Sequence, residues 1–91
     1  MNVELSKKNE YLIAFGKNFR KLRKSKNFSQ AKLAIDLNTD VSLISRIERG
    51  LLNTTILKLK ETSVILSVPV EDFFNFWNKV RINIIRKFIF N

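Results

Sequence analysis

The chain has 91 residues, and its 17 Lys and Arg against 8 Asp and Glu give a formal net charge of +9 at pH 7. It contains no Cys and no His, which excludes disulfide bridges, metal sites built from thiolates or imidazoles, and a Cys or His catalytic group. Because 45% of its residues are hydrophobic, we expect one small folded domain, and its basic charge calls for a negatively charged partner.

The first predicted element is an amphipathic helix over residues 10–26. Its apolar residues recur at steps of three and four, which places them on one stripe of the helix: Leu12, Phe15, Phe19 and Leu22. A second helix is expected after Ser29, whose hydroxyl can cap its first turn. The predicted buried face of this second helix comprises Ala31, Leu33, Ala34 and Leu37.

A short polar turn leads to a third predicted helix over residues 41–49. Asn38 tolerates the left-handed backbone that a sharp turn between helices needs, and Asp40 can cap the helix that follows. Gly50 is the expected stop. The predicted buried side holds Ile44, Ile47 and, at the same spacing beyond the helix, Leu51.

A fourth helix is predicted over residues 55–66, with Asn53 or Thr54 as its cap. It ends before Pro69, because the residue that precedes a proline is driven out of the helical region. Its expected inward residues are Ile56, Leu59 and Leu66.

A fifth helix is predicted to start near Pro69. Glu71 and Asp72 would then lie in its first turn, where the helix dipole favours negative charge. Its expected inward residues are Phe73, Phe74 and Trp77. The spacing over residues 79–91 fits either a strand or a helix, and we favour the helix.

The most informative surface is one face of the third helix. It carries only hydroxyls and guanidiniums, at positions i, i+3, i+4 and i+7: Ser42, Ser45, Arg46 and Arg49. One interpretation is an ordinary solvated face. The other is a surface that reads the DNA major groove, because a short helix set off by a tight turn from the preceding short helix has the geometry of a helix-turn-helix.

Four segments, in the right order, resemble the phage-repressor family of the Cro or XRE type. Residues 29–34 and 44–50 resemble its helix-turn-helix, while residues 15–23 and 66–74 resemble its first helix and the entry to its fifth. The layout is also similar to that of the small controller proteins of restriction-modification systems. The resemblance implies an all-α, five-helix, repressor-type fold that forms a single domain over residues 1–91.

The resemblance also implies roles for individual residues in DNA binding. Base-reading positions are Val41, Ser42, Ser45 and Arg46, and DNA-backbone positions are Ser29, Gln30, Arg49, Asn53 and Thr54. Arg46 either offers a guanidinium fork to guanine or binds phosphate, and Val41 either contacts a thymine methyl or only packs. Arg23 and Glu48 match a structural salt bridge that is largely buried in the family.

The sequence departs from the family pattern at a few positions. Asn38 and Thr39 stand where a Gly and an aliphatic residue are usual, so the turn is expected to pack less tightly. Thr62 and Ser63 stand where Ile and Ala are usual in the fourth helix. Both hydroxyls put the packing of that helix in question, although not the fold.

The segment 75–91 follows the repressor-type core of residues 10–74 and is rich in apolar residues. Dimerisation is the simplest use of such surface, and the predicted dimerisation residues are Phe74, Trp77, Val80, Ile84 and Phe88. Alternatives are a segment that completes the monomer core, a basic amphipathic helix on an anionic membrane, and a binding site for a partner protein. We favour the homodimer and expect no membrane association.

Together these features predict a sequence-specific regulator of transcription that binds double-stranded DNA. We expect a dimeric repressor or autoregulator that reads an inverted repeat through residues 41–49, in the cytoplasm. The competing hypothesis is an antitoxin or other interaction module whose apolar C-terminal segment binds a partner protein. No spacing of carboxylates suggests a catalytic pair, so we expect no enzyme, and no cofactor or metal is indicated.

Overall fold

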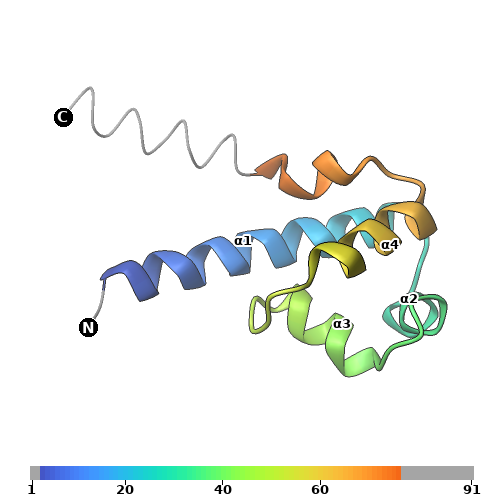
Figure 1. Ribbon diagram of the computed structural model, residues 1–91, viewed down its shortest axis with the longest axis horizontal. Coiled ribbons are helices and arrows are strands. Elements are labelled where there is room, and N and C mark those ends of the chain that lie inside the picture. The colour runs from blue at the N-terminus through green and yellow to red at the C-terminus, as the bar shows by residue number, and fades with distance from the viewer. Residues whose placement is uncertain (1–2, 77–91) are drawn as a thin grey trace.

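The computed structural model describes residues 3–76, with side chains described from Glu10 onward. This part of the chain forms α1 (Val3–Ser25), α2 (Gln30–Asp36), α3 (Val41–Glu48), α4 (Ile56–Leu66) and the 3-10 helix η1 (Val70–Phe74). In Figure 1, α1 runs along the length of the molecule, α2 and α3 lie on one side of it, and η1 lies on the other. The all-α class predicted from the sequence is confirmed.

Two expectations about helices differ from what is found in the described residues. The predicted fifth helix is a short 3-10 helix, which leaves four α-helices between residues 3 and 76. The first helix begins at Val3, upstream of the expected start at Glu10. The predictions for Trp77, Val80, Ile84 and Phe88, and the choice between helix and strand for residues 79–91, lie outside the described residues.

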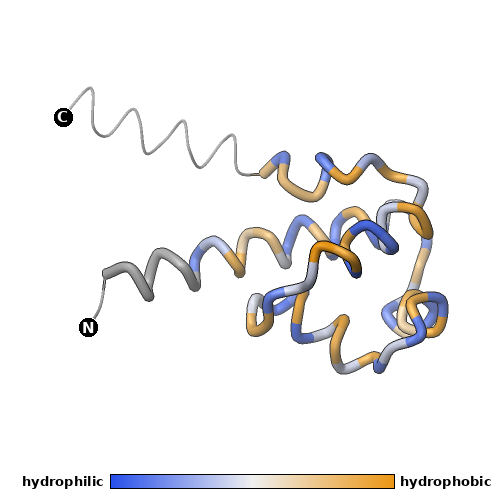
Figure 2. The backbone as a smooth tube through the Cα atoms, in the orientation of Figure 1, coloured by the Kyte–Doolittle hydropathy of each residue, from blue (hydrophilic) through white to orange (hydrophobic). Residues whose placement is uncertain are grey.

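The core forms where the apolar stripe of α1 meets the other helices. Phe19 is 1% exposed, and its ring centroid lies 5.6 Å from that of Phe73 in η1. Figure 2 shows polar and apolar residues alternating along the coloured part of α1, as expected of a helix with one buried face. The buried apolar residues are Phe15, Phe19, Leu33, Ala34, Leu37, Ile44, Ile47, Leu59, Leu66, Val68 and Phe73.

Four residues predicted to be inward are exposed instead. Ala31 lies two positions from Leu33, about 200° around the helix, so it faces solvent. Leu51 is 61% exposed because it follows Gly50, where the chain leaves the helix and helical spacing no longer applies. Ile56 at 89% and Phe74 at 41% lie at the beginning of α4 and the end of η1, at the margin of the core, where solvent reaches their side chains.

The helix caps follow the predicted chemistry, with two changes. Ser29 Oγ accepts the Lys32 backbone N–H at 3.0 Å, as expected. Asp40 occupies the N-cap position of α3, but within the described residues its side chain makes no capping hydrogen bond. The cap of α4 is Thr55 rather than Asn53 or Thr54, and its hydroxyl accepts the N–H of Lys58 at 3.1 Å.

The turn between α2 and α3 needs a residue in the left-handed region, and Asn38 provides it with φ of 55°. Gly50, the predicted stop of the third helix, follows the C-cap Arg49 with φ of 75°. At the end of α4, Ser67 also adopts a left-handed conformation, one residue before the buried Val68. These turns set the directions in which the short helices leave one another.

The two hydroxyl residues that departed from the family pattern are accommodated in α4. Thr62 is 1% exposed, and its hydroxyl donates to the Lys58 carbonyl at 2.8 Å. Ser63 is also buried. Among the described residues no buried side-chain nitrogen or oxygen lacks a hydrogen-bond partner, so the buried hydroxyls carry no desolvation penalty from unmade bonds.

Candidate nucleic-acid interface

Helix α3 has one face in the core and one in solvent. Ile44 and Ile47 are buried, which fixes the rotation of the helix about its axis. The four predicted base-reading residues lie on the outer side: Val41, Ser42 and Arg46 are exposed, and Ser45 is half-buried. The structure therefore brings these four residues together on one face that an external molecule can reach.

Helix α2 packs against α3 and precedes it through a short connection. In Figure 1, α2 is seen almost end-on while α3 runs across the view, so the two helices are steeply inclined to each other. The N-terminal end of α3 is held by this connection, while its C-terminal end rests against α1. Such a pair, with the outer face of the second helix free, has the form of a helix-turn-helix.

The residues predicted to contact the DNA backbone come from two places. Ser29 and Gln30 begin α2; Ser29 is exposed and Gln30 is half-buried. Arg49, exposed at the end of α3, makes a long contact of 3.4 Å from its Nε to the Ser45 carbonyl. Asn53 and Thr54 lie in the loop that follows, where they line one side of an apolar groove.

A buried ion pair joins α1 to α3. Arg23 and Glu48, which the resemblance paired, form a two-point contact: Nε to Oε2 at 2.6 Å and Nη2 to Oε1 at 3.0 Å. The Arg23 side chain also donates from Nη1 to the Phe28 carbonyl at 2.6 Å, in the connection between α1 and α2. Two-point guanidinium–carboxylate pairs are strong and geometrically specific, so Arg23 holds α3, and the connection that leads into α2, to α1.

Gln30 has a partner inside the protein that its sequence pattern does not predict. Its Nε2 donates to Glu48 Oε1 at 3.0 Å, although the two residues are 18 positions apart. The predicted phosphate anchor is thus hydrogen-bonded to the predicted salt bridge. Spacing in the sequence gives no signal for a contact of this kind, because it depends on how α2 packs against α3.

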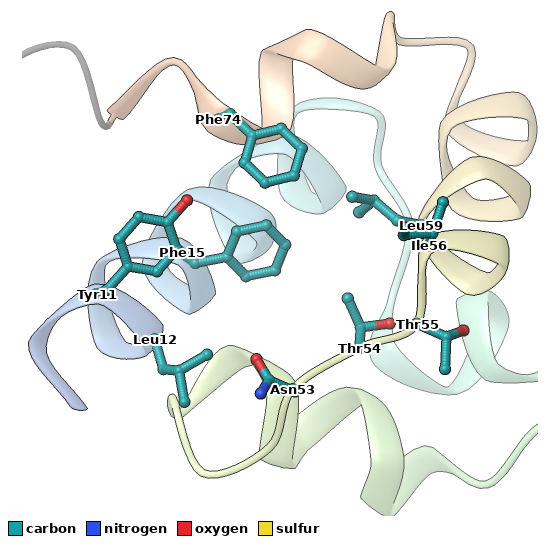
Figure 3. A pocket seen from close by; sticks show the side chains of 9 residues that line it. All are labelled: Tyr11, Leu12, Phe15, Asn53, Thr54, Thr55, Ile56, Leu59 and Phe74. Atoms are coloured by element: carbon teal, nitrogen blue, oxygen red, sulfur yellow. The ribbon is translucent and has the colours of Figure 1, made fainter. Parts of the chain in front are cut away.

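A second unpredicted feature is the apolar groove between α1, the loop before α4 and η1. Figure 3 shows the side chains around it, with the rings of Tyr11, Phe15 and Phe74 facing Ile56 and Leu59. The Phe15 and Phe74 ring centroids are 5.6 Å apart. Of the five predicted dimerisation residues only Phe74 lies in the described residues, and it is half in this groove and half in solvent.

From residue 3 to residue 76, acidic residues do not gather in a group of three or more that could hold a metal ion. In the same part of the chain, no helix has both the length and the apolar character needed to cross a membrane.

Comparison with known proteins agrees with this geometry. Residues 19–73 match the model of the family described as Helix-turn-helix. Control protein C.BamHI of Bacillus amyloliquefaciens is 36% identical over 69 residues, which cover 75% of this chain and 85% of that protein. Control protein C.MunI of a Mycoplasma species is 32% identical over 68 residues, covering 74% and 92% of the two chains.

A solved structure has the same fold. The restriction-modification controller protein C.AhdI from Aeromonas hydrophila matches with a TM-score of 0.67 and 28% sequence identity. The match covers 70% of this chain and 97% of that one. The shared fold thus extends over nearly all of that chain.

Proposed function

The chain belongs to the helix-turn-helix family and is a sequence-specific DNA-binding regulator of transcription, and we propose that it acts as the controller of a restriction-modification system. In this role it binds an inverted repeat as a homodimer and regulates its own transcription. The observation that carries the proposal is the outer face of α3, which is exposed while the opposite face is locked in the core.

The proposed reading of bases follows from the side chains on that face. Arg46 presents a planar guanidinium that pairs with guanine O6 and N7 in the major groove. Ser42 and Ser45 supply hydroxyls that donate to or accept from base edges, and Val41, half exposed at the helix start, contacts a thymine methyl. Recognition by so short a helix requires that its position on the DNA be fixed by other contacts.

We propose that those other contacts are made to the DNA backbone by residues at the two ends of the helix-turn-helix. Ser29 and Gln30 hold the strand beside α2, while Arg49, Asn53 and Thr54 hold it beyond α3. The net charge of +9 adds long-range attraction to phosphate. Affinity then comes mostly from the backbone, and specificity from α3.

Dimerisation is proposed because one helix-turn-helix reads only half of an inverted repeat. Two-fold symmetric proteins place their recognition helices about 34 Å apart, one turn of DNA. Phe74 is 41% exposed at the edge of the described residues and supports an interface there. We propose that residues 10–74 read DNA and that residues 75–91 contribute to the dimer contact.

The finer parts of the proposal follow from the family. Its members regulate transcription, so we assign no enzymatic step to the chain, and we place its action on DNA in the cytoplasm. The two control proteins and the controller structure similar to it suggest which genes it regulates: those of a restriction-modification system, including its own.

A reporter gene tests this role. The DNA upstream of the reading frame of this chain is fused to the reporter, and the wild-type protein or the Arg46→Ala variant is supplied from a second plasmid. We expect the wild type to change reporter output and the variant to leave it near the level without protein. Equal output with both proteins and with neither would contradict autoregulation.

A further inference from the structure

The carboxylate of Glu48 is shared by three helices. On one side it accepts Nε and Nη2 of Arg23, from α1. On the other side, its Oε1 also accepts Nε2 of Gln30, from α2, at 3.0 Å. Glu48 itself lies near the end of α3 and is buried. One buried carboxylate therefore links α1, the first residue of α2, and α3, which carries the base-reading face.

The contact to Gln30 fixes which way its amide group points. A glutamine amide has two N–H donors and one carbonyl oxygen. With one N–H directed at the carboxylate, the nitrogen lies on the inner side and the amide plane is held. Gln30 is only half-buried, so an external molecule can reach part of this residue. The one hydrogen bond of its side chain in the described residues is the bond to Glu48, which leaves the second N–H available to another acceptor.

We propose that Glu48 is a positioning residue for DNA binding, because it holds the Gln30 amide so that its free N–H meets a phosphate in a fixed register with α3. The inference rests on the proposed function, in which Gln30 contacts the DNA backbone. It adds that Glu48 holds the Gln30 amide and the base-reading residues of α3 in one fixed geometry, so that the contact to phosphate and the contacts to bases form together. Arg23 completes the unit by fixing the carboxylate through its two-point contact.

Because Glu48 fixes the Gln30 amide, the contact of Gln30 with a DNA phosphate affects how well the protein selects its cognate site. Contacts to phosphate carry no sequence information themselves, but they fix register and orientation on the duplex. A rigidly held N–H meets its phosphate only when α3 lies at one depth and position in the groove. It therefore stabilises the complex with a cognate site more than complexes with random DNA, in which the protein has no single register.

The simpler alternative is that Gln30 only helps to satisfy a buried charge. Glu48 already has two hydrogen bonds from Arg23, and a carboxylate has about four acceptor positions. If the contact with Gln30 serves packing alone, its loss lowers stability and leaves the ratio of cognate to random binding unchanged. The two interpretations therefore differ in a measurable ratio.

The test is a double-mutant cycle with Gln30→Met and Glu48→Gln in the full-length protein. The Met side chain has nearly the length of Gln without its donors, and Glu48→Gln keeps the size while removing the charge that orients the amide. Dissociation constants are measured on a duplex selected for binding and on a scrambled duplex, with the thermal midpoint of each variant. Lys32→Ala, on the exposed surface of α2, is the matched control.

We expect Gln30→Met to weaken binding to the selected duplex by about three- to tenfold, and to the scrambled duplex by less than about twofold. Glu48→Gln gives a similar loss, and the double variant is no weaker than the weaker single variant. Losses that multiply in the double variant would overturn the inference, because the two residues would then act independently. Equal losses on both duplexes would also overturn it.

A second measurement applies if Glu48→Gln does not fold. Gln30 is the only glutamine of the chain, so labelling glutamine with ¹⁵N gives a single pair of side-chain amide protons. In the free wild type we expect one proton to exchange slowly with water and the other rapidly, and in the complex with the selected duplex both to exchange slowly. Rapid exchange of both protons in the free protein would overturn the inference.

These outcomes stay separate from a failure of the proposed function. That failure would appear in the wild type itself, as equal affinity for selected and scrambled duplexes. A wild type that discriminates between the duplexes while Gln30→Met has no effect on either would leave the proposed function intact and overturn only the role of the shared carboxylate.

Discussion

The backbone of Gly16 lies directly against the backbone of Glu48, at the point where α1 meets the end of α3. A Cβ atom at residue 16 would come within 2.5 Å of the Glu48 carbonyl oxygen, and closer still to that of Ile47. Because Gly16 has no Cβ atom, the end of α3 can pack closely against α1 at this point.

Replacing Gly16 with alanine should accordingly destabilise the fold. The methyl group meets backbone atoms that cannot rotate away, so we expect a loss of about 1–3 kcal/mol even though alanine favours a helix. Thermal unfolding followed by circular dichroism measures this. Lys17→Ala, at the exposed neighbouring position, should change stability by less than about 0.5 kcal/mol. Equal melting temperatures for both variants would contradict the close approach.

The buried pair should behave differently when one or both partners are changed. Arg23→Met leaves the Glu48 carboxylate buried without its counter-charge, and we expect a loss of about 3–5 kcal/mol in urea unfolding. The double variant Arg23→Met with Glu48→Met should recover much of this loss, since apolar residues of similar size often replace buried pairs well. A double variant less stable than Arg23→Met would show that the pair has another role in stability.

Arg46→Ala should weaken cognate binding by about 1–3 kcal/mol and relax the preference at one position of each half-site. The reason is the loss of the two-point contact to a base. Lys17→Ala should weaken binding to every sequence slightly and equally, because it only reduces the attraction to phosphate. Titrations on cognate and scrambled duplexes at the same salt concentration separate the two effects. An equal loss on both duplexes for Arg46→Ala would assign it to phosphate instead.

The proposed dimer can be tested at the edge of the apolar groove. Phe74→Ser removes a ring that is 41% exposed, and we expect it to shift the protein from dimer toward monomer in sedimentation velocity. Ile35→Ser, at a 73% exposed position on α2, is the control and should leave the mass unchanged. If both variants sediment as the wild type does, Phe74 takes no part in the dimer.

Much of the fold could be predicted because the helices carry local signals. Apolar residues at steps of three and four identified the stripe that includes Phe15 and Phe19, and Ser29 identified the start of α2. Asn38 marked the left-handed turn. These signals depend only on neighbours along the chain.

Predictions were wrong where several neighbouring residues could equally well cap a helix, and where the spacing of inward residues was extended to the end of a helix or beyond it. Asn53, Thr54 and Thr55 are three successive residues that can cap a helix, and only the structure shows that Thr55 does. Ile56 keeps the spacing of the inward residues, yet it is the first residue of α4 and lies outside the core.

The exposed face of the candidate site could be predicted from the sequence, but the contacts that join this site to the rest of the protein could not. The outer face of α3 follows from helical spacing. The structure places the four predicted base-reading residues on this face: Val41, Ser42, Ser45 and Arg46. The contact between Gln30 and Glu48, and the groove beside Tyr11, arise from the packing of distant segments. No periodicity in the sequence encodes such contacts.

The central claim is that α3 reads sequence, and selection of bound duplexes from a random DNA pool tests it most directly. The selection is carried out at two salt concentrations, with the wild type and with Arg46→Ala. If α3 reads sequence, the wild type enriches an inverted repeat with its half-sites about one helical turn apart, and the variant loses the preference at one position per half-site. Binding that weakens with salt but enriches no sequence would contradict it, because the outer face of α3 would then only hold phosphates.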